Sequence, residues 1–503
     1  MLDRLSPRGI RIRLFLTCWI VFSLHFATDF VREHYLVVSI VEDHSYRLDR
    51  FYGLHVDIFQ NPPHAKVQGA HHGANPGISM LAAVPYFLLR PAVEAVVRAE
   101  LARRSPADTT TVYRDDRPRR VEFYRQVRQR GLDIRFGLVA AITLVFCMAP
   151  LSAGGVVLLH AVLERLGFTR GRALGFALLY AFATPVLFRT AYLNQNLALG
   201  VAAFTGFVLI WNPGGLVSWS LRRRYGLAGL LGGFAFLCDY SGAILMGLVG
   251  GYAWWRRADD VPPGPAFRDA LWYALGTVPG ILLLWQYQWA SFGNPFLPPQ
   301  HWMAPVEWIE VGYQGVGGFV PELFRMLLLD PRFGLAVTAP LLALGFAGPF
   351  AARDERSPVP FREALAAAGI SLALVIFFST VQYTRLQWVT GIRYLAAIFP
   401  FLFLAAVPLL VRMPRALFAA LAVISAAVSW SLAMVRHQGT VLDNLERVFL
   451  GGFQLPWLTV LSKLSTQYTP WLAQVSPLPL FLVAGTVIYL IWRLEAPWRP
   501  LGR

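Results

Sequence analysis

Long apolar runs alternate with short polar segments along most of the chain. A helix needs roughly 20 apolar residues to cross a hydrocarbon core about 30 Å thick, and most of these runs approach that length. The pattern predicts an all-α fold, a polytopic transmembrane helical bundle of about 12 spans that forms one domain over 1–503. The predicted spans are 14–28, 136–164, 171–190, 193–212, 225–238, 241–255, 269–290, 333–352, 363–381, 392–411, 415–435 and 476–494.

Segment 75–97, "NPGISMLAAVPYFLLRPAVEAVV", has two interpretations that the pattern leaves open. If it crosses the membrane, the parity of the later basic loops requires 136–164 to be a hairpin broken at "APLSAGG", and the count rises to about 14 spans. If it lies flat at the interface, 136–164 is one long tilted span. Its prolines and Arg90 favour the interfacial position, whereas the arginines of 98–135 favour a cytoplasmic location for the segment that follows.

Composition supports the membrane class and accounts for the charge. Hydrophobic residues make up 56% of the chain and charged residues 15%, outside the usual range of soluble domains. A net charge of +16 would suggest nucleic acid in a soluble protein, but here the arginines collect in short loops such as "SLRRRYG" and "WWRRADD". This positive-inside pattern argues against a nucleic-acid partner. It predicts an integral membrane protein with both termini in the cytoplasm and with outer loops at 29–135, 291–332 and 436–475.

The start of the first outer loop places acids directly after an apolar run. Asp29 follows the first span, and Glu33 comes shortly after it. A partly desolvated carboxylate at a membrane boundary can have a raised pKa and act as a general base, so we expect this of Asp29, fixed at the end of a helix. Its simpler role would be to end the span. The same loop contains His71 and His72 among six histidines; their spacing matches no metal-ligand template, so a divalent metal stays an open alternative to a solvated loop.

Other polar residues are also predicted at the mouths of spans. Guanidinium groups at headgroup depth suit a phosphate, which they can bind in a bidentate manner, although each could also only contact lipid headgroups. The stretch "YLNQNL" adds neutral hydrogen-bonding groups or a polar turn, and Asp239 is predicted as a turn residue between two short spans rather than a proton relay. These residues are Arg32, Arg332, Arg385, Trp388, Arg393, Asn194, Gln195 and Asn196.

These stretches resemble the GT-C superfamily of polytopic glycosyltransferases, which includes bacterial aminoarabinose transferases and protein O-mannosyltransferases. "TDFVREHYLVVSIVEDHSY" is similar to the catalytic acid and following helix of that family, and places Asp29 at the acid. "HHGANPGISMLAAVPYFL" is similar to the motif that opens an interfacial helix, and "WVTGIRYLAAIFPFL" to a later element. Two features depart from the family: Asp29 is followed by Phe30 rather than a second acid, and the second outer loop carries Gln195 and its asparagine neighbours instead of an Asp.

The resemblance implies a GT-C-type bundle with interfacial helices in its outer loops, in a bacterial inner membrane. It implies transfer of a sugar from a polyprenyl-phosphate donor to a glycan, lipid or protein acceptor on the outer face, with no certain cofactor. Asp29 and Glu33 would be catalytic, Arg393, Arg332, Arg32 and Arg385 would bind the donor phosphate, and His71, His72, Asn194, Gln195, Asn196 and Trp388 would bind substrate. The alternatives are a transporter or flippase, which usually shows internal repeats that are not found here, and an inactive relative that only binds.

Overall fold

The computed structural model describes residues 5–104, 113, 115, 117–464 and 475–494, and it is a helical polytopic membrane protein. The predicted outer loops 98–135 and 436–475 and both chain ends therefore lie partly outside the described residues. Within them, five helices are long and apolar enough to cross a membrane by length and composition: Gly77–Arg103, Asp133–Arg165, Phe361–Phe378, Tyr394–Arg412 and Arg415–Met434.

Each of the twelve predicted spans coincides with helix in the structure. The helices in these regions are α1 (Pro7–Leu24), α5 (Asp133–Thr143), α6 (Ala149–Arg165), α7 (Arg170–Phe182), α8 (Val186–Thr190), α9 (Gln195–Trp211), α10 (Leu221–Cys238), α11 (Gly242–Ala258), α12 (Pro263–Phe292), α15 (Leu335–Thr338), α16 (Pro340–Ala343), α17 (Gly348–Ala352), α18 (Phe361–Phe378), α19 (Phe399–Arg412), α20 (Arg415–Met434) and α24 (Leu478–Arg493).

The connecting segments hold shorter elements and one long helix, α3. They are α2 (Arg32–Val38), β1 (Ile58–Gln60), β2 (Ala70–His72), α3 (Gly77–Arg103), α4 (Pro118–Gln129), α13 (Glu307–Glu310), α14 (Pro321–Leu329), α21 (Val441–Phe449) and α22 (Pro456–Lys463), with single turns η2 (Ser39–Asp43), η3 (Asp49–Phe51), η4 (Leu144–Met148), η5 (Pro213–Gly215), η6 (Pro299–Trp302), η7 (Leu344–Phe346), η8 (Gln382–Arg385) and η9 (Tyr394–Ile398). Strands β1 and β2 form an antiparallel pair with Phe59 opposite His71.

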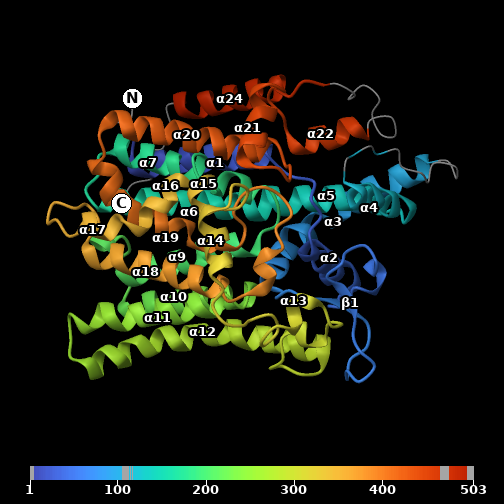
Figure 1. Ribbon diagram of the computed structural model, residues 1–503, viewed down its shortest axis with the longest axis horizontal. Helices are drawn as coiled ribbons and strands as arrows, with labels where there is room; N and C mark the ends of the chain where they lie inside the picture. Colours follow the sequence, from blue (N-terminus) through green and yellow to red (C-terminus); the bar gives the residue numbers. More distant parts are fainter. Residues whose placement is uncertain (1–4, 105–112, 114, 116, 465–474, 495–503) are drawn as a thin grey trace, which may run out of the picture.

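The bundle is layered around a buried central helix. In Figure 1, α10, α11 and α12 form one edge, α20 and α24 lie at the opposite edge, and α6, α9 and α19 lie between them. All residues from Phe399 to Pro408 of α19 are buried, whereas α24 has no buried residue. Close packing of α10 on α12 depends on small residues, because a Cβ on Gly229 or Gly233 would collide with the Tyr273 or Thr277 carbonyl oxygen.

Segment 136–164 is one continuous helix, so the alternative of a hairpin broken at "APLSAGG" is wrong. Pro150 near the start of α6 cannot donate a backbone hydrogen bond, and the wider π-helical turn η4 directly before it accommodates this loss. The prediction of one helix over 333–352 is also wrong. This region breaks into α15, α16, η7 and α17 because Pro340 interrupts it and because Gly345 and Gly348 press against the α19 backbone.

Several of the connecting elements lie at one end of the bundle. In Figure 1, α2, β1, α4 and α13 lie at the right, whereas the turn between α11 and α12 lies at the far left. Helix α10 ends and α11 begins at the same end as α2, so the intervening turn at Asp239 faces these elements. We call this the cleft end, because two adjoining polar cavities open there.

Candidate active site

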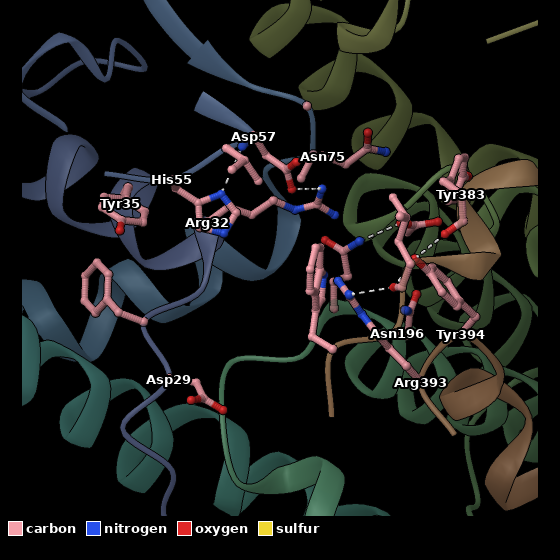
Figure 2. Close-up of a pocket in the computed structure, with 18 of the residues that line it drawn as sticks. Asp29, Arg32, Tyr35, His55, Asp57, Asn75, Asn196, Tyr383, Arg393 and Tyr394 are labelled. Atoms are coloured by element: carbon pink, nitrogen blue, oxygen red, sulfur yellow. Dashed lines mark hydrogen bonds and ion pairs between the residues drawn. The ribbon is translucent and has the colours of Figure 1, made fainter. Parts of the chain in front are cut away.

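Two adjoining cavities of about 370 and 280 Å3 open at the cleft end and are together called the cleft. The link between α1 and α2, the start of α9 and the segment before η9 contribute to both, as Figure 2 shows for the larger one. Residues far apart in the chain therefore share one space. Those that line both cavities include Asp29, Arg32, Asp57, Arg120, Gln195, Asn196, Trp388 and Arg393.

Asp29 lies in an extended link rather than at a helix end. Helix α1 stops at Leu24, and the chain then turns to pair with α8, where the Ala27 amide donates to the Ala191 carbonyl (2.8 Å). The prediction that Asp29 is fixed at the end of the first helix is therefore wrong. The side chain of Asp29 is 27% exposed and faces both cavities.

Two arginines hold the Asp29 carboxylate in its ionised form. Arg436 donates from Nε and Nη2 to Oδ2 (2.8 and 2.7 Å), and Arg120 Nη1 is 3.6 Å from Oδ1. Burial would raise the pKa of Asp29, but the charges of Arg436 and Arg120 outweigh it and lower the pKa to about 2. The expectation of a raised pKa is wrong, and the carboxylate stays ionised at all ordinary pH values.

Arg32 is neutralised within the cleft by two carboxylates. Its Nε donates to Glu33 (3.0 Å) and its Nη1 to Asp57 (3.0 Å). Glu33 is 5% exposed, and although burial would raise its pKa, the neighbouring Arg32 holds it below the ordinary value. The charge of Arg32 likewise outweighs burial at Asp57 and lowers the pKa of that carboxyl group. Arg32 therefore acts here as the centre of an ion-paired group and has little free charge for a ligand.

Asp239 is a carboxylate with neutral partners only. It caps the turn between α10 and α11 by accepting from Ser241 N (2.9 Å) and Oγ (2.7 Å), and it accepts from Gln195 Nε2 (2.6 Å). Among the described residues, no Lys or Arg nitrogen lies within 4.0 Å of it, and burial raises its pKa. The predicted turn is confirmed, but Asp239 also lines the larger cavity. The predicted position of Asp239 on the same face as Asp29 was the sequence feature that could have indicated its place in the cavity wall.

Two guanidinium groups of the cleft have no carboxylate within 4.0 Å among the described residues. Arg393 donates to the Leu386 carbonyl (3.4 Å) and lies over the Tyr394 ring. Arg189 is 1% exposed and donates to the Ile392 carbonyl (2.7 Å), the Gly391 carbonyl and Tyr192 Oη (2.8 Å). Arg189 thus ties α8 to the segment that carries Arg393. It lies within a predicted span, and only the tertiary fold brings it to the cleft.

Neutral polar and aromatic groups complete the walls. Asn194 caps α9 by accepting from the Leu197 amide (3.2 Å) and lines the smaller cavity. Gln195 and Asn196 line both cavities, and Trp388, which is half exposed, covers them near Arg119. Amides, hydroxyls and ring faces of this kind suit an uncharged polar ligand with many hydroxyl groups.

Four predicted site residues line neither cavity. Arg332 and Arg385 are about half exposed and face Asp330 (3.8 Å) and Glu322 (4.0 Å). His71 and His72 are buried on β2, where burial lowers the pKa of both imidazoles. No group of three or more His, Cys, Asp or Glu side chains arranged to hold a metal ion occurs within the described parts of the chain.

Comparison with known proteins gives one match. No protein-family model and no curated protein matches the chain. Among solved structures, the fold is similar to the crystal structure of ArnT from Cupriavidus metallidurans bound to undecaprenyl phosphate. The TM-score is 0.48 and the sequence identity 15%, over 96% of this chain and 75% of that chain. What the protein does is therefore inferred from the residues of its own cleft.

Proposed function

We propose that the protein is a membrane glycosyltransferase that moves a sugar from a polyprenyl-phosphate donor to an acceptor hydroxyl group in the cleft. The observation that carries the proposal is the combination of charges in one space. Ionised Asp29 lines the smaller cavity together with Arg393 and Arg189, which have no carboxylate within 4.0 Å among the described residues. Such a site can accept a proton on one side and stabilise a departing phosphate on the other.

The proposed reaction is a single displacement with inversion. The acceptor oxygen bonds to the anomeric carbon, the bond from this carbon to the phosphate oxygen breaks, and polyprenyl phosphate leaves with the electron pair. Arg393 and Arg189 stabilise the charge on that phosphate. The hydroxyl proton goes to Asp29, and Glu33 holds the Arg32 side chain in place within the same cleft. Asp239, with its raised pKa, is the second carboxylate placed to take this proton.

An apolar groove next to the cleft supports a lipid-linked donor. It has a volume of about 600 Å3, and its walls include Trp19, Leu24, Phe26, Val145 and Trp457. Phe26 is only three residues before Asp29, so a tail in this groove would place its attached phosphate near the cleft. The cleft end would face the extracytoplasmic side, as the arginine-rich turns at the opposite end suggest.

A transfer assay in nanodiscs tests the proposal. Full-length protein is given a panel of radiolabelled polyprenyl-phosphate sugars, and release of polyprenyl phosphate is followed for wild type, Asp29→Asn, Asp239→Asn and the control Asp260→Asn, an exposed acid of the α11–α12 turn. We expect Asp29→Asn to lower kcat by ~10²–10⁴-fold, the usual contribution of a general base, and Asp260→Asn to match wild type.

The other outcomes of this assay distinguish the enzyme class from the identity of the general base. Full activity in Asp29→Asn with loss in Asp239→Asn would keep the glycosyltransferase and move the base to Asp239. No release from any donor, together with no donor binding, would contradict the glycosyltransferase proposal and favour transport.

A further inference from the structure

A third cavity lies beside the cleft, and the proposed reaction does not use it. It has a volume of about 240 Å3 and lies between the start of α4, residues 434–438 and helices α21 and α22. We call it the basic cavity, because the charged side chains among the described residues that line it are Arg117, Arg120, Arg436, Arg447, Lys463 and the acid Asp115. Lys463 and Arg447 line neither cavity of the cleft.

Among the described residues that line the basic cavity, positively charged side chains outnumber negatively charged ones. Asp115 is 4% exposed and already accepts from Arg117 (Nε 2.7 Å, Nη2 2.9 Å) and Lys463 (3.1 Å). Asp29, on the cleft side, accepts from Arg436 and approaches Arg120. Among the described residues, these two carboxylates serve four of the five cationic groups, and Arg447 has no carboxylate within 4.0 Å. A partly enclosed site with this imbalance attracts an anion more strongly than an open surface does.

The arrangement also supplies directed donors. Arg117 donates to the Arg436 carbonyl (3.3 Å), and Arg120 donates to Thr28 Oγ1 (3.1 Å), so both guanidinium groups are held in fixed positions. Fixed guanidinium groups and a lysine are the groups that bind phosphate most strongly in proteins. Arg120 and Arg436 also line the cleft, so a ligand here lies one layer of side chains from Asp29.

We propose that the basic cavity binds a phosphate-type oxyanion, carried either by the acceptor or by a lipid headgroup. That an acceptor carries the oxyanion rests on the proposed function, whereas the binding of the oxyanion itself does not. A bound oxyanion shares Arg120 and Arg436 with Asp29 and so holds its carrier next to the carboxylate.

Binding of inorganic pyrophosphate tests the site without any donor or turnover. Radiolabelled pyrophosphate is titrated at low salt into full-length protein in phosphatidylcholine nanodiscs. The test variant is the double substitution Lys463→Ala with Arg447→Ala. The control is Lys66→Ala with Arg325→Ala, which removes the same charges from exposed positions that line none of the three cavities. All four side chains are at least partly exposed, so both variants should fold.

We expect wild type and the control to bind alike and the test variant to bind about tenfold more weakly or worse, as the loss of charge-assisted contacts implies. Equal affinities of the two double variants, or no binding by wild type at millimolar pyrophosphate, would overturn the proposal. Adding phosphatidylglycerol to the nanodiscs then identifies the source: competition with pyrophosphate assigns the site to a lipid headgroup, and unchanged binding assigns it to the acceptor. Failure of the transfer assay with successful binding would contradict the proposed function alone.

Discussion

Two aspartates of the cleft have environments that shift their pKa values in opposite directions. Arg436 and Arg120 outweigh burial at Asp29 and hold its pKa at about 2, whereas burial among neutral partners raises the pKa of Asp239. Pairs of carboxyl groups separated in this way are typical of sites that move protons. Asp29 is therefore ionised and able to accept a proton over the whole ordinary pH range, whereas Asp239 loses its proton only above the ordinary aspartate pKa.

This difference predicts how transfer depends on pH. If Asp239 must be ionised, kcat/KM falls as pH drops through its raised pKa, so the acid limb of the wild-type profile should lie above about 4, the ordinary aspartate value. The residual activity of Asp239→Asn should lack this limb, whereas that of Asp29→Asn should keep it, since Asp29 does not titrate there. Profiles measured from pH 4 to 9 check this. If the acid limb is unchanged in Asp239→Asn, it reports the titration of another group.

The sequence could predict those site residues that are polar and lie at the ends of apolar runs. Asp29, Gln195, Asn196 and Arg393 each follow or precede such a run, and all four line the cleft. The partners that set their chemistry could not be found in this way. Arg436 lies 407 residues from Asp29 in the chain, and Arg189 lies inside a predicted span. Only the packed fold shows which charges meet, and this is why the predicted pKa of Asp29 had the wrong direction.

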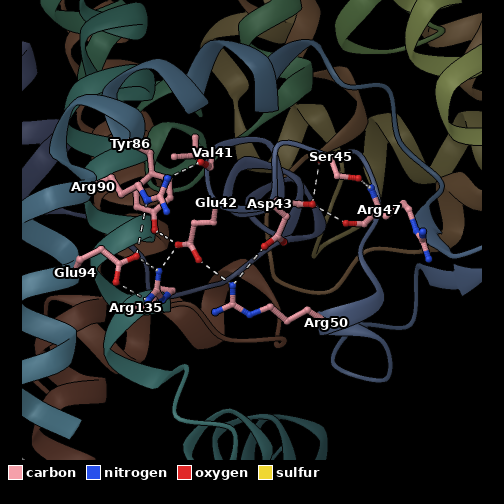
Figure 3. A network of polar contacts seen from close by, with 11 residues as sticks. Val41, Glu42, Asp43, Ser45, Arg47, Arg50, Tyr86, Arg90, Glu94 and Arg135 are labelled. Atoms are coloured by element: carbon pink, nitrogen blue, oxygen red, sulfur yellow. Dashed lines mark hydrogen bonds and ion pairs between the residues drawn. The ribbon is translucent and has the colours of Figure 1, made fainter. Parts of the chain in front are cut away.

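At the scale of elements, a partly buried ionic network links η2, the turn directly after α2, to α3 and α5 (Figure 3). Glu42 in η2 bonds to Arg135, Tyr86 and Arg50, and Arg135 also donates to Glu94 (3.0 and 3.2 Å). Because α2 begins with Arg32 and Glu33, the network positions one wall of the cleft. The sequence predicted the helices that meet here, but it carried no signal for the pairing of their charges.

Removal of Arg135 should loosen this junction. Arg135→Ala removes both hydrogen bonds from Arg135 to Glu94, and it leaves Glu42 bonded to Arg50 and Tyr86. We therefore expect the free energy of unfolding to fall by ~1–3 kcal/mol and the unfolding temperature to fall with it. The control Arg98→Ala removes an exposed arginine of α3 that donates to the carbonyl of Glu94 in its own helix. Thermal unfolding in nanodiscs compares the two. Equal unfolding temperatures would show that the network contributes nothing to stability.

The whole molecule has two chemically different ends. The cleft, the basic cavity and α2, β1 and α4 lie at one end, whereas the turns that carry Arg256, Arg257 and Arg353 lie at the other. Arginine-rich short loops remain in the cytoplasm during membrane insertion. The prediction of an extracytoplasmic cleft therefore depends on the whole arrangement, because no single segment shows which side the cavities face.

Cysteine labelling tests this orientation directly. Cys18, Cys147 and Cys238 are all buried, so single cysteines can be introduced into the natural chain with little background. Val56→Cys places a thiol at a 71% exposed position of the cleft end, and Asp260→Cys places one in the α11–α12 turn. A membrane-impermeant maleimide should label Val56→Cys in intact cells and Asp260→Cys only after lysis. The opposite result would place the cleft in the cytoplasm, where the donor would have to be drawn from the inner leaflet, and the proposed side of the reaction would be wrong.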